Sequence, residues 1–248
     1  MSAPTPGSAF PMSDVDFDAV YQGKPLVEGS GIAFDLAPWD IKAPQPAVVD
    51  LVRDGQFRGE VLDVGCGLGE NALFLAANGY RVTGVDGSAA GLEQAGRRAA
   101  ERGVDVTFVH ADATALTELP EQRFDTVLDS ALYHCLDDEQ RQLYAAALHR
   151  VTAPGARLHL LCFADVDAGL RFPIAVSQDN LRANLGAHWD IEDIRPGSYT
   201  TSLTPEVFSR IGEDALANLG FTVDAQRVRQ DEQGRIVGPI WQLRATRH

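Results

Sequence analysis

Three glycines at alternating positions form the most informative pattern in the sequence. Gly65, Gly67 and Gly69 lie in VLDVGCGLGE, between an apolar run and a helical segment. Glycine lets the backbone approach a ligand closely, and the N–H groups at a helix N-terminus point outward. The dinucleotide fingerprint G-x-G-x-x-G would require a glycine where Glu70 stands. Because an acid there would repel a pyrophosphate, we interpret the loop as the receptor of an amino acid head group.

Polar residues follow the next two apolar runs along the chain. Asp86 and Gly87 end the run in VTGVDGS, and Asp112 and Ala113 follow the run in VHADA. At the carboxyl end of a strand, a carboxylate such as Asp86 can accept both ribose hydroxyls of a nucleoside. The pair Asp112–Ala113 could recognise an adenine edge. Either acid alone could be a cap, a solvated loop residue or an Asx turn, but their joint occurrence favours a nucleoside site.

A third polar group lies in the segment DSALYH, residues 129–134. His134 could be the base that removes a proton from a hydroxyl or ring N–H group, because an unperturbed imidazole titrates at about pH 6.5. The alternative is that His134 packs or bonds locally. Its neighbour Tyr133 is the second candidate catalytic residue.

A regular alternation of predicted strands and helices positions these residues. The strands are short apolar runs at 60–64, 81–85, 106–110, 124–129 and 156–163. The helices between them, several with capping residues, cover 71–78, 88–102 and 137–151. This alternation indicates right-handed β-α-β units and a mostly parallel sheet.

Two segments beyond residue 163 compete for the last helix and the sixth strand. One covers 176–194 and the other 204–225. We take the first as part of the sheet and treat residues 197–236 as an insertion that caps the substrate. Residues 239–246 alternate in polarity and form a strand in either case.

In combination, LDVGCGLGE, VTGVDGS, VHADA, FDTVLDSALYH and PGARLHLLCF resemble the class I S-adenosylmethionine-dependent methyltransferase family, over residues 59–163. The resemblance implies an α/β, Rossmann-like fold with helices on both faces. Its seven-stranded, mostly parallel sheet would have the order 3-2-1-4-5-7-6, with the seventh strand antiparallel.

The resemblance also implies roles for the candidate residues. The glycine loop, including Cys66, would hold the methionine portion of S-adenosylmethionine. Asp86 would bind the ribose and Asp112 the adenine N6. Asp129, at the start of the loop after the fourth strand, would lie beside the sulfonium. The segment DSAL there lacks the Asn/Asp-Pro-Pro-Tyr pattern of members that methylate amide or adenine nitrogens, which speaks against those substrates.

Short flanking segments, PWDI at 38–41 and the ending PIWQL, resemble the bacterial heterocyclic toxin methyltransferases. This narrower resemblance implies methyl transfer to an oxygen or nitrogen of a small aromatic or heterocyclic acceptor. An acidic phenol or N-hydroxy group would need no base at all.

Aromatic residues precede the sheet. Trp39, Tyr21 and Phe34 could cover the sulfonium by cation–π contact or sandwich a flat substrate; the alternative is ordinary core packing. We predict that residues 1–44 form an N-terminal arm that closes over the cofactor, and that residues 45–248 form a single methyltransferase domain.

Composition narrows the class of partner. The 248 residues carry 35 acids against 21 Lys and Arg, a net charge of −14, which argues against nucleic acid or an anionic membrane surface. The 3 cysteines form no C-x-x-C pair, which fits a reducing cytoplasm. We also see no signal peptide or spanning segment, so we expect a soluble cytoplasmic protein. Asp129, Asp165 and Asp167 offer carboxylates, but their spacing does not show convergence on one Mg²⁺, and we predict no metal.

Two other functional classes remain open from the sequence. The chain could be a non-catalytic protein that keeps the S-adenosylmethionine cradle as a sensor or scaffold. An NAD(P)-dependent oxidoreductase is disfavoured by Glu70.

Overall fold

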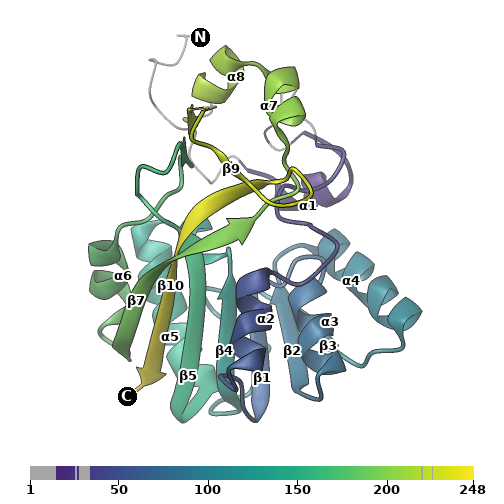
Figure 1. The fold of residues 1–248 in the computed structure, drawn as a ribbon. Coiled ribbons are helices and arrows are strands. Elements are labelled where there is room, and N and C mark those ends of the chain that lie inside the picture. The colour runs from purple at the N-terminus through teal and green to yellow at the C-terminus, as the bar shows by residue number, and fades with distance from the viewer. Residues whose placement is uncertain (1–14, 26, 28–33, 219, 225) are drawn as a thin grey trace, which may run out of the picture.

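A twisted sheet forms the centre of the fold, and helices cover both of its faces (Figure 1). The computed structural model describes residues 15–25, 27, 34–218, 220–224 and 226–248. In spatial order the strands are β3 (Thr107–His110), β2 (Arg81–Asp86), β1 (Glu60–Val64), β4 (Phe124–Ser130), β5 (Thr152–Phe163), β10 (Ile236–Arg247) and β7 (Trp189–Thr200). The first five are mutually parallel, and β10 runs antiparallel to both of its neighbours. The predicted order 3-2-1-4-5-7-6 is confirmed, and a short β9 (Arg229–Gln230) adds to β10.

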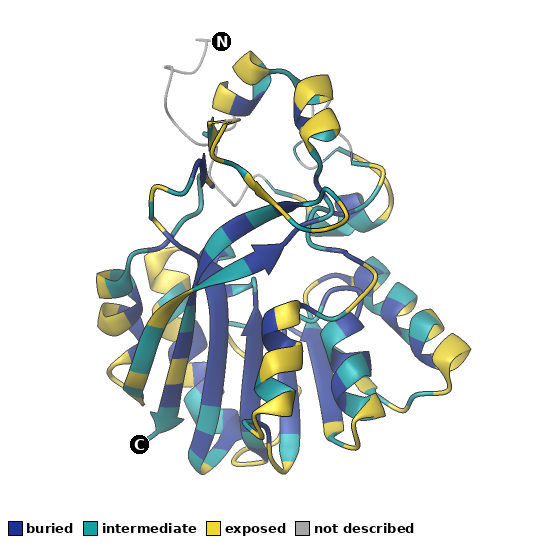
Figure 2. Ribbon diagram, viewed as in Figure 1, coloured by how far each residue is buried: buried dark blue, intermediate teal, exposed yellow. Residues whose placement is uncertain are grey.

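The central strands read as continuous apolar runs because both faces of the sheet are buried. Leu62 and Val64 of β1 pack in one cluster with α5 (Asp138–Val151) and α6 (Gln178–Leu185). Val61 packs in the other with α2 (Pro46–Arg53) and α3 (Glu70–Ala77). Figure 2 shows the result, with central strands buried along their length and helices exposed on their outer sides.

Local signals in the sequence fix the helix ends. The helix α4 (Ala89–Arg102) begins after Ser88, whose side chain accepts from the Gly91 N–H, and it ends at Gly103 with φ +62. Asp137 and Gln140 form a reciprocal capping box at the start of α5. These caps satisfy N–H groups that a helix leaves unpaired at its first turn.

The structure corrects two boundaries. The fifth strand was expected to begin at residue 156, but β5 already begins at Thr152, and Gly155 takes φ +72 within it. The strand β7 continues to Thr200, so the first four residues of the segment 197–236 belong to the sheet. Pairing with β10 extends β7 beyond its apolar residues. A prediction from apolar residues alone therefore ends the strand too early.

A smaller group of elements lies beyond the carboxyl ends of the parallel strands, and we call it the cap (Figure 1). It contains α7 (Pro205–Ile211), α8 (Glu213–Asn218) and the antiparallel pair β6 (Leu170–Arg171) and β8 (Thr222–Val223), together with Phe172, which follows β6. The segment 204–225, the competitor for the last helix and the sixth strand, lies in the cap, where Gly212, at φ +88, separates α7 from α8.

Candidate active site

The glycine loop joins β1 to α3 at the carboxyl edge of the sheet. Gly67 adopts φ +51, and its N–H donates to Asp86 Oδ2 at 2.7 Å. A Cβ at this position would lie 2.6 Å from the Tyr21 hydroxyl oxygen, so only glycine fits. The Cys66 N–H and carbonyl are already bonded, to the Val85 carbonyl and the Gly69 N–H. These two bonds shape the loop, and the contact of Cys66 with the cofactor stays a prediction.

Asp86 stands at the carboxyl end of β2, where the sequence placed it. One oxygen accepts from the Gly67 N–H and the other from the Ser88 N–H at 2.8 Å. Burial raises its pKa, and these two N–H groups oppose the shift. Each carboxylate oxygen has a further lone pair, so Asp86 can still accept ribose hydroxyls. Gly87, next to it, is exposed.

Asp63 is a functional candidate that the sequence reasoning missed. Its side chain is buried within β1, and Oδ2 finds no hydrogen-bond partner among the described residues. Burial first, and then the charges of Asp129 and Asp86, raise its pKa to about 7. An unpaired buried carboxylate oxygen is costly, so a cationic ligand is expected to compensate it. The overlooked signal is an acid in the middle of the apolar run VLDVG.

The electrostatics of this edge match S-adenosylmethionine. Asp63, Asp86 and Asp129 lie on the neighbouring strands β1, β2 and β4. Such a site repels the pyrophosphate of a dinucleotide and accepts a ligand that carries a sulfonium and an ammonium group. The residues present therefore fit the cofactor that the resemblance implies.

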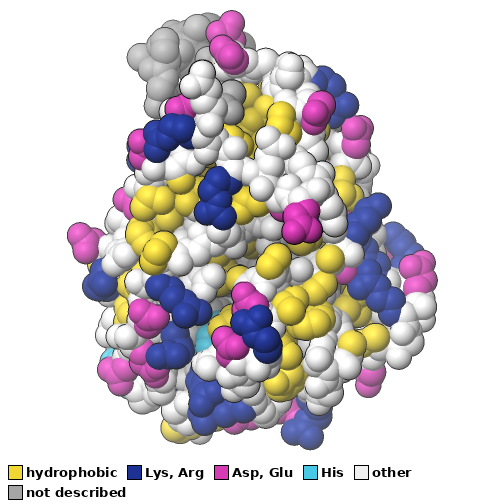
Figure 3. Space-filling view, viewed as in Figure 1, with side chains coloured by type: hydrophobic (Ala, Val, Ile, Leu, Met, Phe, Trp, Pro, Cys, Tyr) yellow, Lys and Arg dark blue, Asp and Glu magenta, His cyan; other side chains and the backbone are white. Residues whose placement is uncertain are grey.

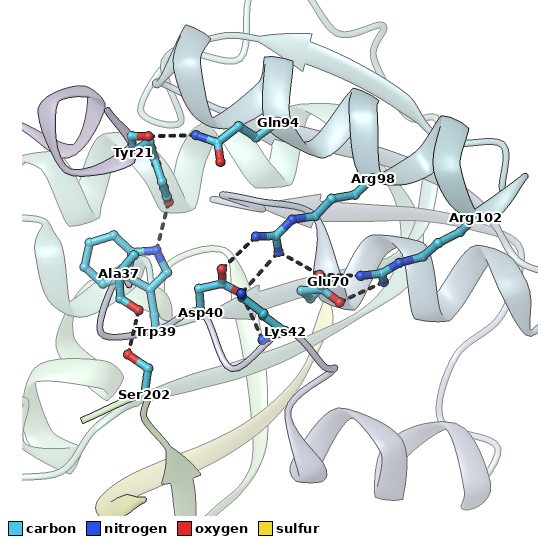
Figure 4. Close-up of polar contacts among 10 residues, drawn as sticks. All are labelled: Tyr21, Ala37, Trp39, Asp40, Lys42, Glu70, Gln94, Arg98, Arg102 and Ser202. Atoms are coloured by element: carbon cyan, nitrogen blue, oxygen red, sulfur yellow. Dashed lines mark hydrogen bonds and ion pairs between the residues drawn. The ribbon is translucent and has the colours of Figure 1, made fainter. Parts of the chain in front are cut away.

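Glu70 does not take part in this selection. Its side chain is buried and pairs with Arg98 and Arg102 of α4, each at 2.7 Å (Figure 4). Two guanidinium groups one helical turn apart thus neutralise it. Our interpretation that Glu70 repels a pyrophosphate is wrong, and the three edge acids supply that effect instead.

The described part of the N-terminal arm lies against α4 and the glycine loop. Asp18 of α1 (Phe17–Tyr21) accepts from the Ser88 hydroxyl at 2.6 Å and the Ala90 N–H at 2.9 Å. Trp39 Nε1 donates to the Tyr21 hydroxyl at 2.9 Å, and their rings meet edge to face (Figure 4). Trp39 is thereby placed beside Gly67: a Cβ atom added to Gly67 would lie 3.8 Å from Trp39 Nε1.

The arm is fastened by an ion network. Asp40 pairs with Arg98 at 2.7 Å, and its side chain is 1% exposed. Arg98 bridges it to Glu70 (Figure 4). Phe34, the third aromatic residue considered for the site, packs against the core cluster that contains α2 and α3, and Trp39 also contacts this cluster, as the alternative of core packing proposed. Residues 1–14, 26 and 28–33 of the predicted arm lie outside the described residues.

Asp112 forms the Asx turn that was left open as an alternative. Oδ1 accepts from the Thr114 N–H at 2.8 Å and from its hydroxyl at 2.7 Å. The turn follows β3, at the same edge as Asp86, and Asp112 is exposed. Its second oxygen and the Ala113 N–H have no partner among the described residues, so both can face an adenine.

Asp129 is directed into the protein. It is fully buried and accepts from the Leu132 N–H at 2.9 Å, the Tyr133 N–H at 3.1 Å and the Tyr144 hydroxyl at 2.7 Å. Burial raises its pKa to about 6. Its carboxylate holds the loop after β4 in shape, so its contribution beside a sulfonium would be charge rather than contact.

The two catalytic candidates also have partners inside the protein. The Tyr133 hydroxyl donates to Asn180 Oδ1 at 3.1 Å, and its ring lies under the Arg141 guanidinium, which removes it from the site. The His134 Nδ1 accepts from the Phe163 N–H at 3.1 Å. Burial lowers the pKa of His134 to about 3. A base needs a free lone pair and a pKa near neutrality, so the structure favours the alternative that His134 bonds locally.

The described residues contain no cluster of three His, Cys, Asp or Glu side chains that could hold a metal. Asp167, one of the acids considered for Mg²⁺, pairs with Arg227 at 3.0 Å. None of the described helices is long and apolar enough to cross a membrane.

The segment that contains the glycine loop and the edge acids matches a known family. Residues 61–155 match a family described as "Methyltransferase domain". The 2-heptyl-1-hydroxyquinolin-4(1H)-one methyltransferase of Mycobacteroides abscessus is 37% identical over 166 residues, which cover 64% of this chain and 71% of that protein. The chain belongs to the class I S-adenosylmethionine-dependent methyltransferases.

Two solved methyltransferase-fold structures extend the comparison. One is described as "Conversion of a Disulfide Bond into a Thioacetal Group during Echinomycin Biosynthesis". It has a TM-score of 0.73 and 34% sequence identity, and the match covers 93% of this chain and 90% of that chain. The Burkholderia thailandensis 1,6-didemethyltoxoflavin-N1-methyltransferase has a TM-score of 0.53 at 20% identity, over 82% and 76% of the two chains, and shows the shared fold.

Replacing Asp63 tests the unpaired carboxylate. Asp63→Asn should weaken S-adenosylhomocysteine binding by about 10-fold or more, measured by calorimetry, because the ligand ammonium loses its counter-charge. In the wild type, affinity should be highest above pH 7 and fall toward pH 6, because the carboxyl with pKa about 7 takes up a proton and loses its charge. The Asn variant should lose this pH dependence. 5′-Methylthioadenosine, which lacks the amino acid, should bind both proteins alike; an equal loss for both ligands would contradict the assignment.

The ion network predicts a stability difference between two pairs. Asp40→Ala should lower the free energy of unfolding by about 1–3 kcal/mol in urea denaturation, because Arg98 loses one of its two buried partners. The matched control is Glu93→Ala, which breaks an exposed pair with Arg97 and should cost less than about 0.5 kcal/mol. Equal losses in the two variants would show that the network does not hold the arm.

Proposed function

We propose that this methyltransferase moves the methyl group of S-adenosylmethionine to an oxygen or nitrogen of a small, flat aromatic or heterocyclic acceptor. The observation that carries this proposal is the group of aromatic side chains between the cap and the carboxyl end of β5. Phe172 of the cap stacks on Phe163 of β5, with ring centroids 3.7 Å apart and an angle of 6° between the planes.

The aromatic group continues on both sides of that stack. Tyr199 meets the edge of Phe163 at 5.8 Å, and Phe221 meets Phe172 at 5.6 Å. Gly238 of β10 makes room for the stack, because a Cβ there would lie 2.6 Å from the Phe172 ring. Aromatic rings attract one another in offset and edge-to-face contacts, and a planar heterocycle could add to this group by such contacts.

The relatives support the same acceptor class. The relative from M. abscessus is named for a hydroxyquinolone, and the B. thailandensis structure holds 1,6-didemethyltoxoflavin and S-adenosylhomocysteine. The description of the echinomycin structure names a disulfide. A sulfur acceptor therefore belongs in any substrate panel.

The side chains of this site would act by binding and positioning. S-adenosylmethionine supplies an electrophilic methyl carbon, which an acceptor atom attacks in line. Asp63 would hold the ammonium group, Asp86 the ribose, and Asp112 with Ala113 the adenine. Trp39 and Tyr21 would cover the site and exclude water. Such alignment can supply roughly 7–11 kcal/mol of a barrier, and an acidic hydroxyl ionises without a base.

We place the division between arm and domain near residue 44. In this arrangement the arm is the lid of the cofactor site, supported by the contacts of Asp18 and Tyr21 with α4 and the glycine loop. The cap, which comprises residues 170–172 and 201–235, would line the acceptor pocket, since acceptor choice lies in such additions to a shared fold. The acceptors proposed here are small molecules, with no role for nucleic acid. Figure 3 shows acidic and basic side chains interspersed on the face it presents.

The activity itself is tested with labelled S-adenosylmethionine and a panel of 1-hydroxyquinolin-4(1H)-one, hydroxyquinolines, phenols and a thiol. We expect methyl transfer to at least one heterocyclic oxygen or nitrogen. Asp86→Ala should abolish cofactor binding by calorimetry, whereas Asp105→Ala, an acid on the amino side of β3, should leave it unchanged. Tight cofactor binding without transfer to any acceptor would favour the alternative, a non-catalytic sensor or scaffold.

The lid is tested by limited proteolysis of the arm. S-adenosylhomocysteine should slow cleavage before residue 44 by about 10-fold, because binding selects the closed arm. Asp18→Ala should reduce this protection, since it removes the bonds to Ser88 and Ala90. The control is Asp54→Ala, at the exposed end of α2. Equal cleavage with and without ligand would rule out a lid.

A further inference from the structure

We infer that His134 recognises the methyl acceptor as a fixed hydrogen-bond donor, through its Nε2–H group, to a ring carbonyl oxygen of that acceptor. This inference rests on the proposed function and gives His134 a role opposite to that of a base. It assigns a specificity-determining residue in the loop after β4.

The tautomer of His134 follows from one backbone contact. The Phe163 N–H donates to Nδ1 at 3.1 Å, so Nδ1 carries a lone pair and no proton. A neutral imidazole with an accepting Nδ1 must carry its proton on Nε2. Burial keeps the ring neutral, with a pKa of about 3, and the nearby Arg141 charge acts in the same direction.

The orientation of the ring is fixed by stacking. His134 lies on the Phe163 ring with centroids 4.4 Å apart and an angle of 20°, and Phe163 in turn lies on Phe172. Three stacked rings thus connect the loop after β4, the end of β5 and the cap. A donor held on such a support loses little entropy when it binds.

The Nε2–H group has no acceptor among the described residues, although the side chain is only 4% exposed. The polar atoms of a nearly enclosed side chain normally have partners, so the free Nε2–H marks a place where a ligand can supply one.

The chemistry of the acceptor follows from the donor. An N–H group without a protein partner favours a ligand with an oxygen lone pair in the ring plane, and a ligand without such an oxygen leaves the donor unpaired. An N-hydroxy heterocycle with a ring carbonyl presents such an oxygen separately from the atom that receives the methyl group.

Two substitutions separate the two ring nitrogens. His134→Asn keeps an acceptor near the position of Nδ1 for the Phe163 N–H and loses the Nε2–H donor. His134→Gln keeps an N–H donor near the position of Nε2 and loses the acceptor. Each protein is assayed with 1-hydroxyquinolin-4(1H)-one and with 1-hydroxyindole, which share the N-hydroxy group and differ in the ring carbonyl.

We expect His134→Asn to lower kcat/KM for the quinolone by about 10-fold or more, mainly through KM, and to change that for the indole by less than about 3-fold. His134→Gln should retain most of the preference for the quinolone. Equal losses for both acceptors, or a larger loss in Gln than in Asn, would mean that His134 is only structural. If both variants lose turnover and the pH profile loses one limb, the hypothesis that His134 is a general base would be supported instead.

Calorimetric binding of the quinolone to the S-adenosylhomocysteine complex distinguishes this proposal from the proposed function. If the wild type methylates neither acceptor but binds the quinolone more tightly than His134→Asn does, the donor role stands and the proposed acceptor class for transfer fails. If the wild type does not bind the quinolone, or binds it no more tightly than the Asn variant, the donor role is overturned.

Discussion

Burial of carboxylates at the carboxyl edge of the sheet is the constraint on which this structure depends. Asp86 and Asp129 are tolerated there because backbone N–H groups, and the Tyr144 hydroxyl for Asp129, donate to them. Asp63 keeps one oxygen unpaired, and its pKa rises accordingly. The donors that compensate the first two acids also shape the glycine loop and the loop after β4. The cofactor cradle is therefore the set of contacts that makes the burial of charge possible.

The protein compensates buried acids in two different ways. Glu70 and Asp40 are neutralised by Arg98 and, for Glu70, also Arg102, and these pairs fasten the arm to α3 and α4. At the edge itself, the contacts of Asp63, Asp86 and Asp129 are with hydroxyl and N–H donors. The arginine pairs stabilise the packing of the arm. Among the described residues, the acids at the edge have no cationic partner, so their negative electrostatic potential favours a bound cation. The net charge of −14 thus combines neutralised pairs, a solvated surface and a small functional part.

Cofactor and acceptor depend on different parts of the chain. The parallel strands and the glycine loop offer acids and backbone groups, which suit the polar cofactor. The cap and the ends of β4 and β5 offer stacked rings, which suit a flat acceptor. Phe172 meets the sheet at Phe163 of β5 and Gly238 of β10, away from the glycine loop. In the proposed function, changes in the cap would therefore alter the acceptor without disturbing the cradle.

The sequence by itself determined the order of strands and helices, their caps, and the position of Asp86, because apolar periodicity and strand ends are local properties of the chain. It did not determine where side chains point. Glu70 turns to Arg98 and His134 bonds to Phe163, partners about 28 residues away that only the folded sheet brings close. Asp63 was overlooked for the same reason: whether a buried acid is paired or open depends on neighbouring strands, and tertiary structure decides which groups remain free for a ligand.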